Sequence, residues 1–171
     1  PGSNTNSNGM MDGGMMGNNN SSSGFSGSDI MFAQMMIPHH QQAVDMSALA
    51  ETHTTNPELL ALAKQIKDAQ APEIKQMTGW IKDSGASMDM GHDMGMGGML
   101  SDEQMTALEN ATGAAFDKLY LEGMIGHHEG ALQMAKMIAD SNNAEAKTLA
   151  ANIVSSQSAE IEKMKQMLAG M

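Results

Sequence analysis

The second half of this chain repeats the first half, and the repeat limits the possible folds more than any other feature of its 171 residues. Residues 36–40, Met-Ile-Pro-His-His, return 88 positions later as residues 124–128, Met-Ile-Gly-His-His. Residues 70–77 return 87 positions later as residues 157–164, with Gln, Glu, Ile and Met at matching places. A difference of one residue fits within a turn between two helices. We therefore predict two copies of one structural unit.

Helical spacing of apolar side chains indicates that this unit is a helical hairpin. Ser28 is a candidate N-cap, Asn56-Pro57 is typical of a helix start, and Ser101 begins a capping box. The expected helices cover 29–54, 58–83, 102–109, 113–140 and a last stretch that ends near 169. Each hairpin has one apolar stripe to bury. The sequence therefore predicts an all-α, antiparallel four-helix bundle made of two repeated hairpins.

Two stretches differ from the bundle, which is expected to occupy residues 29–171. Residues 1–28 are rich in Met, Gly, Ser and Asn and are expected to be disordered. Pro-Gly-Ser at 1–3 is typical of the scar left when a protease removes an expression tag, so a missing targeting segment carries no information about compartment. Residues 84–100 are expected to form a flexible Met/His-rich linker.

Charge and composition exclude several classes of protein. The chain has 20 acidic and 9 basic residues and a formal net charge of −11, which argues against nucleic acid and anionic membranes as partners. No run of 18 apolar residues exists, so no transmembrane segment is expected. The absence of Cys removes thiolate catalysis, disulfides and thiolate zinc sites.

The 21 Met residues are the unusual part of the composition. A thioether is a soft ligand that needs no deprotonation, and with imidazole it suits copper, above all Cu(I), and also Ag(I). Many Met and no Cys fit a soft-metal binder outside the reducing cytosol. A core that uses Met as adaptable filler explains the same composition, and composition alone does not separate the two interpretations.

The duplicated His-His motif supplies candidate metal ligands on the helices. At 100° per residue, the motif and its flanking Met side chains fall within about 120° of one helix face. The candidate metal positions are Met36, His39, His40, Met46 and Met77, and their copies Met124, His127, His128, Met134 and Met164. Met77 and Met164 alone fit core packing better. Adjacent His side chains point in different directions, so one of each pair can bind metal while the other bonds to a carboxylate. Suitable acceptors are Asp29, Glu73, Asp117 and Glu160.

The linker carries a second group of candidate ligands. These are Met88, Met90, His92, Met94, Met96 and Met99. A Gly-rich segment has no core for thioethers to fill, whereas flexible capture of Cu(I) or Ag(I) would use them, and His92 could also take Cu(II). Met10, Met11, Met15 and Met16 form a weaker version of the same pattern. A low-complexity linker without a binding role is the alternative.

Motifs for other chemistry are missing from the sequence. No Glu-x-x-His occurs, which argues against the di-iron carboxylate sites of similar bundles. The Gly-x-Ser-x-Gly, phosphate-loop and His-Glu-x-x-His motifs are also missing. We therefore predict no catalytic residues and no organic cofactor, and an enzymatic function is left only as copper-dependent redox chemistry.

The residues that carry the doubled motif resemble the bacterial domain-of-unknown-function 305 family. The matching segments are 36–43 and 124–131, with Phe116-Asp117 and Glu160-Ile161 followed by Met164. The resemblance covers about residues 29–169. It implies a ferritin-like four-helix bundle, a periplasmic or extracellular location with export or lipid anchoring, and a role in copper tolerance like that of the CopM-type periplasmic members. By motif it also implies metal at the duplicated Met and His positions of 36–46 and 124–134.

The sequence thus predicts an extracytoplasmic, non-enzymatic protein that sequesters Cu(I) or hands it on, in copper resistance or metal homeostasis. Ag(I) and Cu(II) are further ions to test, and another copper-handling protein is a candidate transfer partner. Two alternatives from other classes remain: a cuprous-oxidase-like redox enzyme, and a structural or adaptor bundle whose Met residues only pack. Turnover of Cu(I) with oxygen would identify the first, and a lack of tight copper binding the second.

Overall fold

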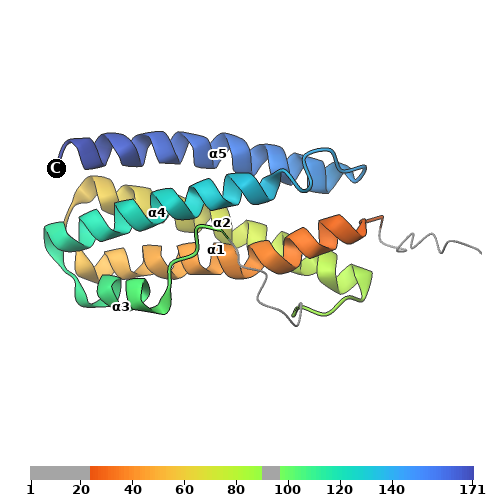
Figure 1. The fold of residues 1–171 in the computed structure, drawn as a ribbon, viewed down its shortest axis with the longest axis horizontal. Coiled ribbons are helices and arrows are strands. Elements are labelled where there is room, and N and C mark those ends of the chain that lie inside the picture. The colour runs from red at the N-terminus through yellow and green to blue at the C-terminus, as the bar shows by residue number, and fades with distance from the viewer. Residues whose placement is uncertain (1–23, 90–96) are drawn as a thin grey trace, which may run out of the picture.

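The computed structural model describes residues 24–89 and 97–171, and every regular element in these ranges is a helix. The elements are α1 (Gly27–His53), α2 (Pro57–Ser84), α3 (Asp102–Asn110), α4 (Gly113–Ala135) and α5 (Ala144–Ala169). Four of them are long, and α3 is a single short helix before α4 (Figure 1). The all-α fold class is confirmed. The disorder expected for residues 1–28 falls almost wholly outside the described residues.

Local capping explains most of the helix boundaries. Asn56 caps α2 through its side chain, and Gly85 ends it in the left-handed conformation with φ +73°. Ser101 and Gln104 form the capping box expected for α3. The N-cap of α1, however, is Ser26 and not the expected Ser28. Ser26 Oγ accepts a hydrogen bond from the Asp29 amide at 3.1 Å, and the Ser26 amide donates to the Asp29 carboxylate at 2.8 Å, which makes a full capping box two residues earlier.

Helix α4 ends at Ala135 and not at the expected Asp140. The amides of Lys136, Met137 and Ile138 donate to carbonyls three residues back rather than four, so the backbone tightens into turns. Ile138 is fully buried in the core at that end of the molecule. Burial of this side chain favours the tighter turn over a straight continuation of the helix.

The helices pack as two hairpins against each other. Helix α1 lies against α2, α4 lies against α5, and α1 also lies against α4 (Figure 1). Two apolar core clusters follow one another along the long axis. The first contains residues 30–36 of α1 and 131–135 of α4, and the second contains residues 43–50 of α1 and 116–124 of α4. The residues between these clusters, near the middle of α1 and α4, are the duplicated histidines.

No helix in the described ranges combines the length and apolar character that a bilayer span requires.

Candidate metal centre

Four histidines lie between the two apolar clusters. His39 and His40 are near the middle of α1, and His127 and His128 are near the middle of α4. All four side chains are buried, at 1% exposure or less. The sequence repeat therefore produces a buried polar layer across the α1–α4 seam.

His39 and His127 contact each other across the seam. Their ring centroids lie 3.7 Å apart, with 34° between the ring planes. Burial is the main cause that lowers the pKa of His39 to about 4, although its hydrogen bond to the Gly97 carbonyl acts in the opposite direction. Burial, followed by the neighbouring His39 and His128 rings, also holds the pKa of His127 well below its ordinary value. Both rings are therefore neutral at pH 7, the form in which imidazole binds metals.

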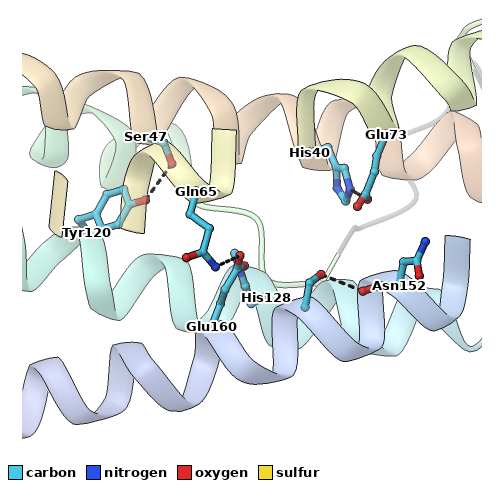
Figure 2. A network of polar contacts seen from close by, with 9 residues as sticks. His40, Ser47, Gln65, Glu73, Tyr120, His128, Asn152 and Glu160 are labelled. Carbon is cyan, nitrogen blue, oxygen red and sulfur yellow. Dashed lines mark hydrogen bonds and ion pairs between the residues drawn. The ribbon is translucent and has the colours of Figure 1, made fainter. Parts of the chain in front are cut away.

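The other His of each pair bonds to a glutamate from the partner helix of its own hairpin. Nε2 of His40 lies 2.7 Å from the Glu73 carboxylate, and Nε2 of His128 lies 2.6 Å from the Glu160 carboxylate (Figure 2). Gln65 of α2 also donates to Glu160 at 3.2 Å. The predicted contact of one His in each pair with a carboxylate is therefore present in both copies.

The two aspartates do not act as acceptors for these histidines. Asp29 belongs to the α1 capping box, where it accepts from the Ser26 amide. Asp117 accepts a hydrogen bond from the Asn56 side chain at 3.1 Å, at the start of α2. Their places in the repeat correspond, but both lie too far along their helices to reach the histidine layer.

The polar layer contains buried nitrogen and oxygen atoms without hydrogen bonds. Within the described residues these are Nδ1 of His39, His40 and His128, and both ring nitrogens of His127. The repeat-related Gln70 and Gln157 add further unpartnered amide atoms. Buried polar groups almost always have partners, so this concentration indicates a place for water or a ligand. Sequence reasoning saw the Gln repeat but did not assign it to the site.

The six candidate methionines on the helices fall into two sets related by the repeat. Met36, Met77 and Met134 belong to the first core cluster, and their counterparts Met124, Met164 and Met46 belong to the second. All six are buried. One set thus adjoins each side of the histidine layer, and apolar packing accounts for their positions as fully as ligation would.

The linker candidates are only partly within the described residues. Met88 is exposed and Met99 is half-buried. Met90, His92, Met94 and Met96 lie outside the described residues, as do Met10, Met11, Met15 and Met16. The last residues of the expected flexible linker differ from the prediction, because Leu100 is buried and hydrogen-bonded to Gln42.

Acidic and imidazole groups alone do not form a metal site here. In residues 24–89 and 97–171, no three His, Asp or Glu side chains are arranged to hold one ion. Three of the four histidines already use Nε2 in hydrogen bonds to Gly97, Glu73 and Glu160. While these three bonds are in place, an ion in this layer would need the free Nδ1 atoms, Nε2 of His127 or thioether ligands.

The fold and this layer define a class of all-helical proteins with a duplicated, buried His-His motif. Within that class, the chain belongs to the family described as Domain of unknown function (DUF305), whose sequence profile matches residues 29–168. No curated protein sequence matches the chain.

Several solved structures are similar to the chain over most of its length. A DUF305 protein from Streptomyces coelicolor is 35% identical, with a TM-score of 0.78, 84% of this chain covered and 93% of that one. A DUF305 fragment from Deinococcus radiodurans is 27% identical, with a TM-score of 0.79 and coverage of 85% and 98%. CopM in its Cu(I)-bound form is 34% identical, with a TM-score of 0.71 and coverage of 83% and 96%. CopM has also been solved with Cu(II) and with silver.

Proposed function

We propose that this protein is an extracytoplasmic copper-binding protein that sequesters Cu(I) or hands it on to another copper-handling protein. Its fold on this proposal is a ferritin-like, antiparallel four-helix bundle of two repeated hairpins. The observation that carries the proposal is the buried layer of neutral, partly unpartnered His39 and His127 between two sets of methionines. In this role copper is the cargo of the protein, and Ag(I) and Cu(II) are further ions that it could take.

The donor chemistry supports a soft ion. Imidazole nitrogen with thioether sulfur, and no thiolate, suits Cu(I) and Ag(I) better than Mg²⁺ or Ca²⁺, which prefer oxygen ligands. His39 and His127 need not release a proton at pH 7, since burial already keeps both neutral. Glu73 and Glu160 orient their histidines in the way that carboxylates orient metal-bound imidazole, with Nδ1 left free.

Similarity to CopM supports the same function from an independent direction. CopM structures hold Cu(I), Cu(II) and silver, and they share a third of their residues with this chain. Export is supported by the Streptomyces coelicolor DUF305 protein, provisionally described as secreted, and by the lack of Cys. The missing catalytic motifs support a binding protein over an enzyme.

An anaerobic Cu(I) titration against a chromophoric competitor tests the proposal. One variant changes His39, His40, His127 and His128 to Ala, and a second changes Met88, Met90, Met94, Met96 and Met99 to Leu. His53→Ala serves as the control, because His53 lies at the end of α1 and bonds to the Leu49 and Glu109 carbonyls instead. We expect the four-His variant to bind fewer equivalents of Cu(I) tightly than the control variant binds.

The same titration separates the alternatives. No competitive uptake by the intact protein would overturn the copper function and leave a Met-packed structural bundle. Oxygen consumption with repeated turnover of added Cu(I) would indicate a redox enzyme. Loss of uptake only in the linker variant would move the binding site from the helices to residues 84–100.

A further inference from the structure

Residues 97–100, here called the strap, run across the seam between α1 and α4 before α3 begins (Figure 1). The strap fits against α4 because α4 lacks side chains there. A Cβ added to Gly130 would lie 1.9 Å from the Gly97 carbonyl oxygen, and a Cβ on Gly123 would lie 3.0 Å from the Leu100 side chain. These distances show that glycines in α4 make room for the strap.

Gly98 places the strap backbone against the turn of α4 next to the histidine layer. Its φ of +81° lies in the left-handed region, and a Cβ there would lie 2.2 Å from the Gly126 carbonyl oxygen and 3.1 Å from the Cα of His127. Only glycine meets both conditions without strain. The strap backbone therefore lies directly on the turn of α4 that carries His127.

Helix α1 holds the strap from the other side. The side chain of Gln42 accepts from the Leu100 amide at 2.8 Å and donates to the Leu100 carbonyl at 3.0 Å, as a neighbouring β-strand would. Nε2 of His39 donates to the Gly97 carbonyl at 3.1 Å. Both ends of the strap are thus attached to α1, and the second attachment uses the ring that contacts His127.

Helix α1 lacks the glycines that α4 has at the matching positions of the repeat. The positions in α1 that correspond to Gly123, Gly126 and Gly130 are Met35, Pro38 and Gln42. Glycine inside a helix costs roughly 1 kcal/mol relative to alanine, so Gly123 and Gly130, where a Cβ would meet residues 97–100, need a compensating role. Seating the strap supplies that role.

We propose that the strap is a gate that covers the His39–His127 pair and must lift from the glycine face of α4 before a soft metal ion reaches Nε2 of His39. The hydrogen bond from His39 to Gly97 and a bond from the same nitrogen to an ion exclude each other. Strap seating and ion binding at that nitrogen therefore oppose one another, and by linkage each weakens the other. The gate function rests on the proposed copper function, whereas the seating of the strap does not.

Gly130→Ala and Gly126→Ala form a matched pair for the test. Alanine at 130 would collide with the strap, whereas a Cβ at 126 meets nothing within 4 Å. Both substitutions favour the helix, so neither should unfold α4. Gln42→Ala releases the strap from α1 without changing α4, and circular dichroism checks each variant for helix content.

The first readout uses no metal. Diethyl pyrocarbonate modifies neutral imidazole, and mass mapping of peptides reports each histidine, with His53 as the internal reference. We expect the rate of modification at His39 to rise about tenfold in Gly130→Ala and to rise in Gln42→Ala, but to stay at the wild-type value in Gly126→Ala. Equal rates in Gly130→Ala and Gly126→Ala would overturn the seating of the strap.

The second readout is the rate of anaerobic Cu(I) transfer from the competitor. We expect faster uptake in Gly130→Ala than in Gly126→Ala. Changed labelling of His39 with unchanged uptake rates would overturn the gate and leave the strap as a structural cover. If no variant and no wild-type protein takes up Cu(I), the copper function and with it the gate fail, while the labelling result for the seating stands.

Discussion

The rings of His39 and His127 contact each other in a tilted arrangement, with centroids 3.7 Å apart, although they come from different copies of the repeat. Two imidazolium cations would repel at this distance, so the contact requires that at least one ring be neutral. Burial supplies that condition for both rings. The pair therefore joins α1 to α4 and at the same time keeps both rings in the form that binds metal.

The metal-free protein should lose stability as the pH falls from about 6.5 towards 4. The pKa of His39 is about 4 when folded and near 6.5 when unfolded, so the unfolded chain binds more protons in this window. The stabilisation is complete above 6.5 and declines below it, by about 3 kcal/mol in the free energy of unfolding for His39 alone. His127 acts in the same direction.

Urea unfolding of the metal-free protein between pH 7.5 and 5.5 measures this loss before most carboxylates titrate. His53→Ala should show the same dependence of the free energy of unfolding on pH as the wild type, because His53 lies outside the histidine layer. A stability that does not change across this range would show that the buried rings are not held neutral.

Glu160→Gln should weaken Cu(I) binding by about 10- to 100-fold if His128 is a ligand, because the carboxylate orients its ring through a 2.6 Å hydrogen bond. Glu73→Gln should do the same for His40. Competitor titration measures the affinity, and the exposed Glu162→Gln on the same helix is the control. Unchanged affinity in both layer variants would place the ion away from His40 and His128.

Met36→Leu with Met124→Leu separates ligation from packing. Leucine has nearly the same volume, so the free energy of unfolding should change by less than about 1.5 kcal/mol per site. If the thioethers bind the ion, Cu(I) and Ag(I) stoichiometry should fall while denaturant unfolding stays near the wild-type midpoint. Full stoichiometry in the double variant would leave these two methionines as core residues only.

Alanine in place of the glycine inside α2 and of the glycine at its C-cap should have opposite effects on stability. Gly85→Ala should destabilise by about 1–2 kcal/mol, because φ is +73° at this C-cap although the surrounding space is open. Gly79→Ala should stabilise by up to about 1 kcal/mol, since it lies inside the helix and a Cβ there meets nothing within 4 Å. Thermal unfolding of the two variants gives the sign, and a loss in both would contradict the α2 boundary.

Much of the fold follows from local patterns. Helical spacing and caps predicted the ends of α1, α2, α3 and α5 within about two residues. The end of α4 was wrong by five residues, because burial of Ile138 decides the tighter turn and no local pattern reports it. Asp29 was also expected as an acceptor for a histidine, but its carboxylate belongs to the local capping box of α1.

The candidate site was predictable in its members but not in their contacts. The repeat identified the four histidines and the two glutamates, because identical helical registers place equivalent side chains on equivalent faces. It could not show that Gln70 and Gln157 are buried with unpartnered amide atoms, since a buried amide and an exposed one have the same local sequence pattern.

The sequence by itself determined two hairpins, each with a His-His pair and a glutamate on its partner helix, because helix formation and side-chain direction depend on neighbours within a few residues. Only the tertiary structure decided that His39 pairs with His127 while His40 and His128 turn to glutamates, and that residues 97–100 lie on the glycine face of α4. Adjacent side chains on a helix point about 100° apart, so the packing of α1 against α4 chooses which of them face each other. The strap depends on space left by glycines about thirty residues further along the chain, a condition that exists only once the helices have packed.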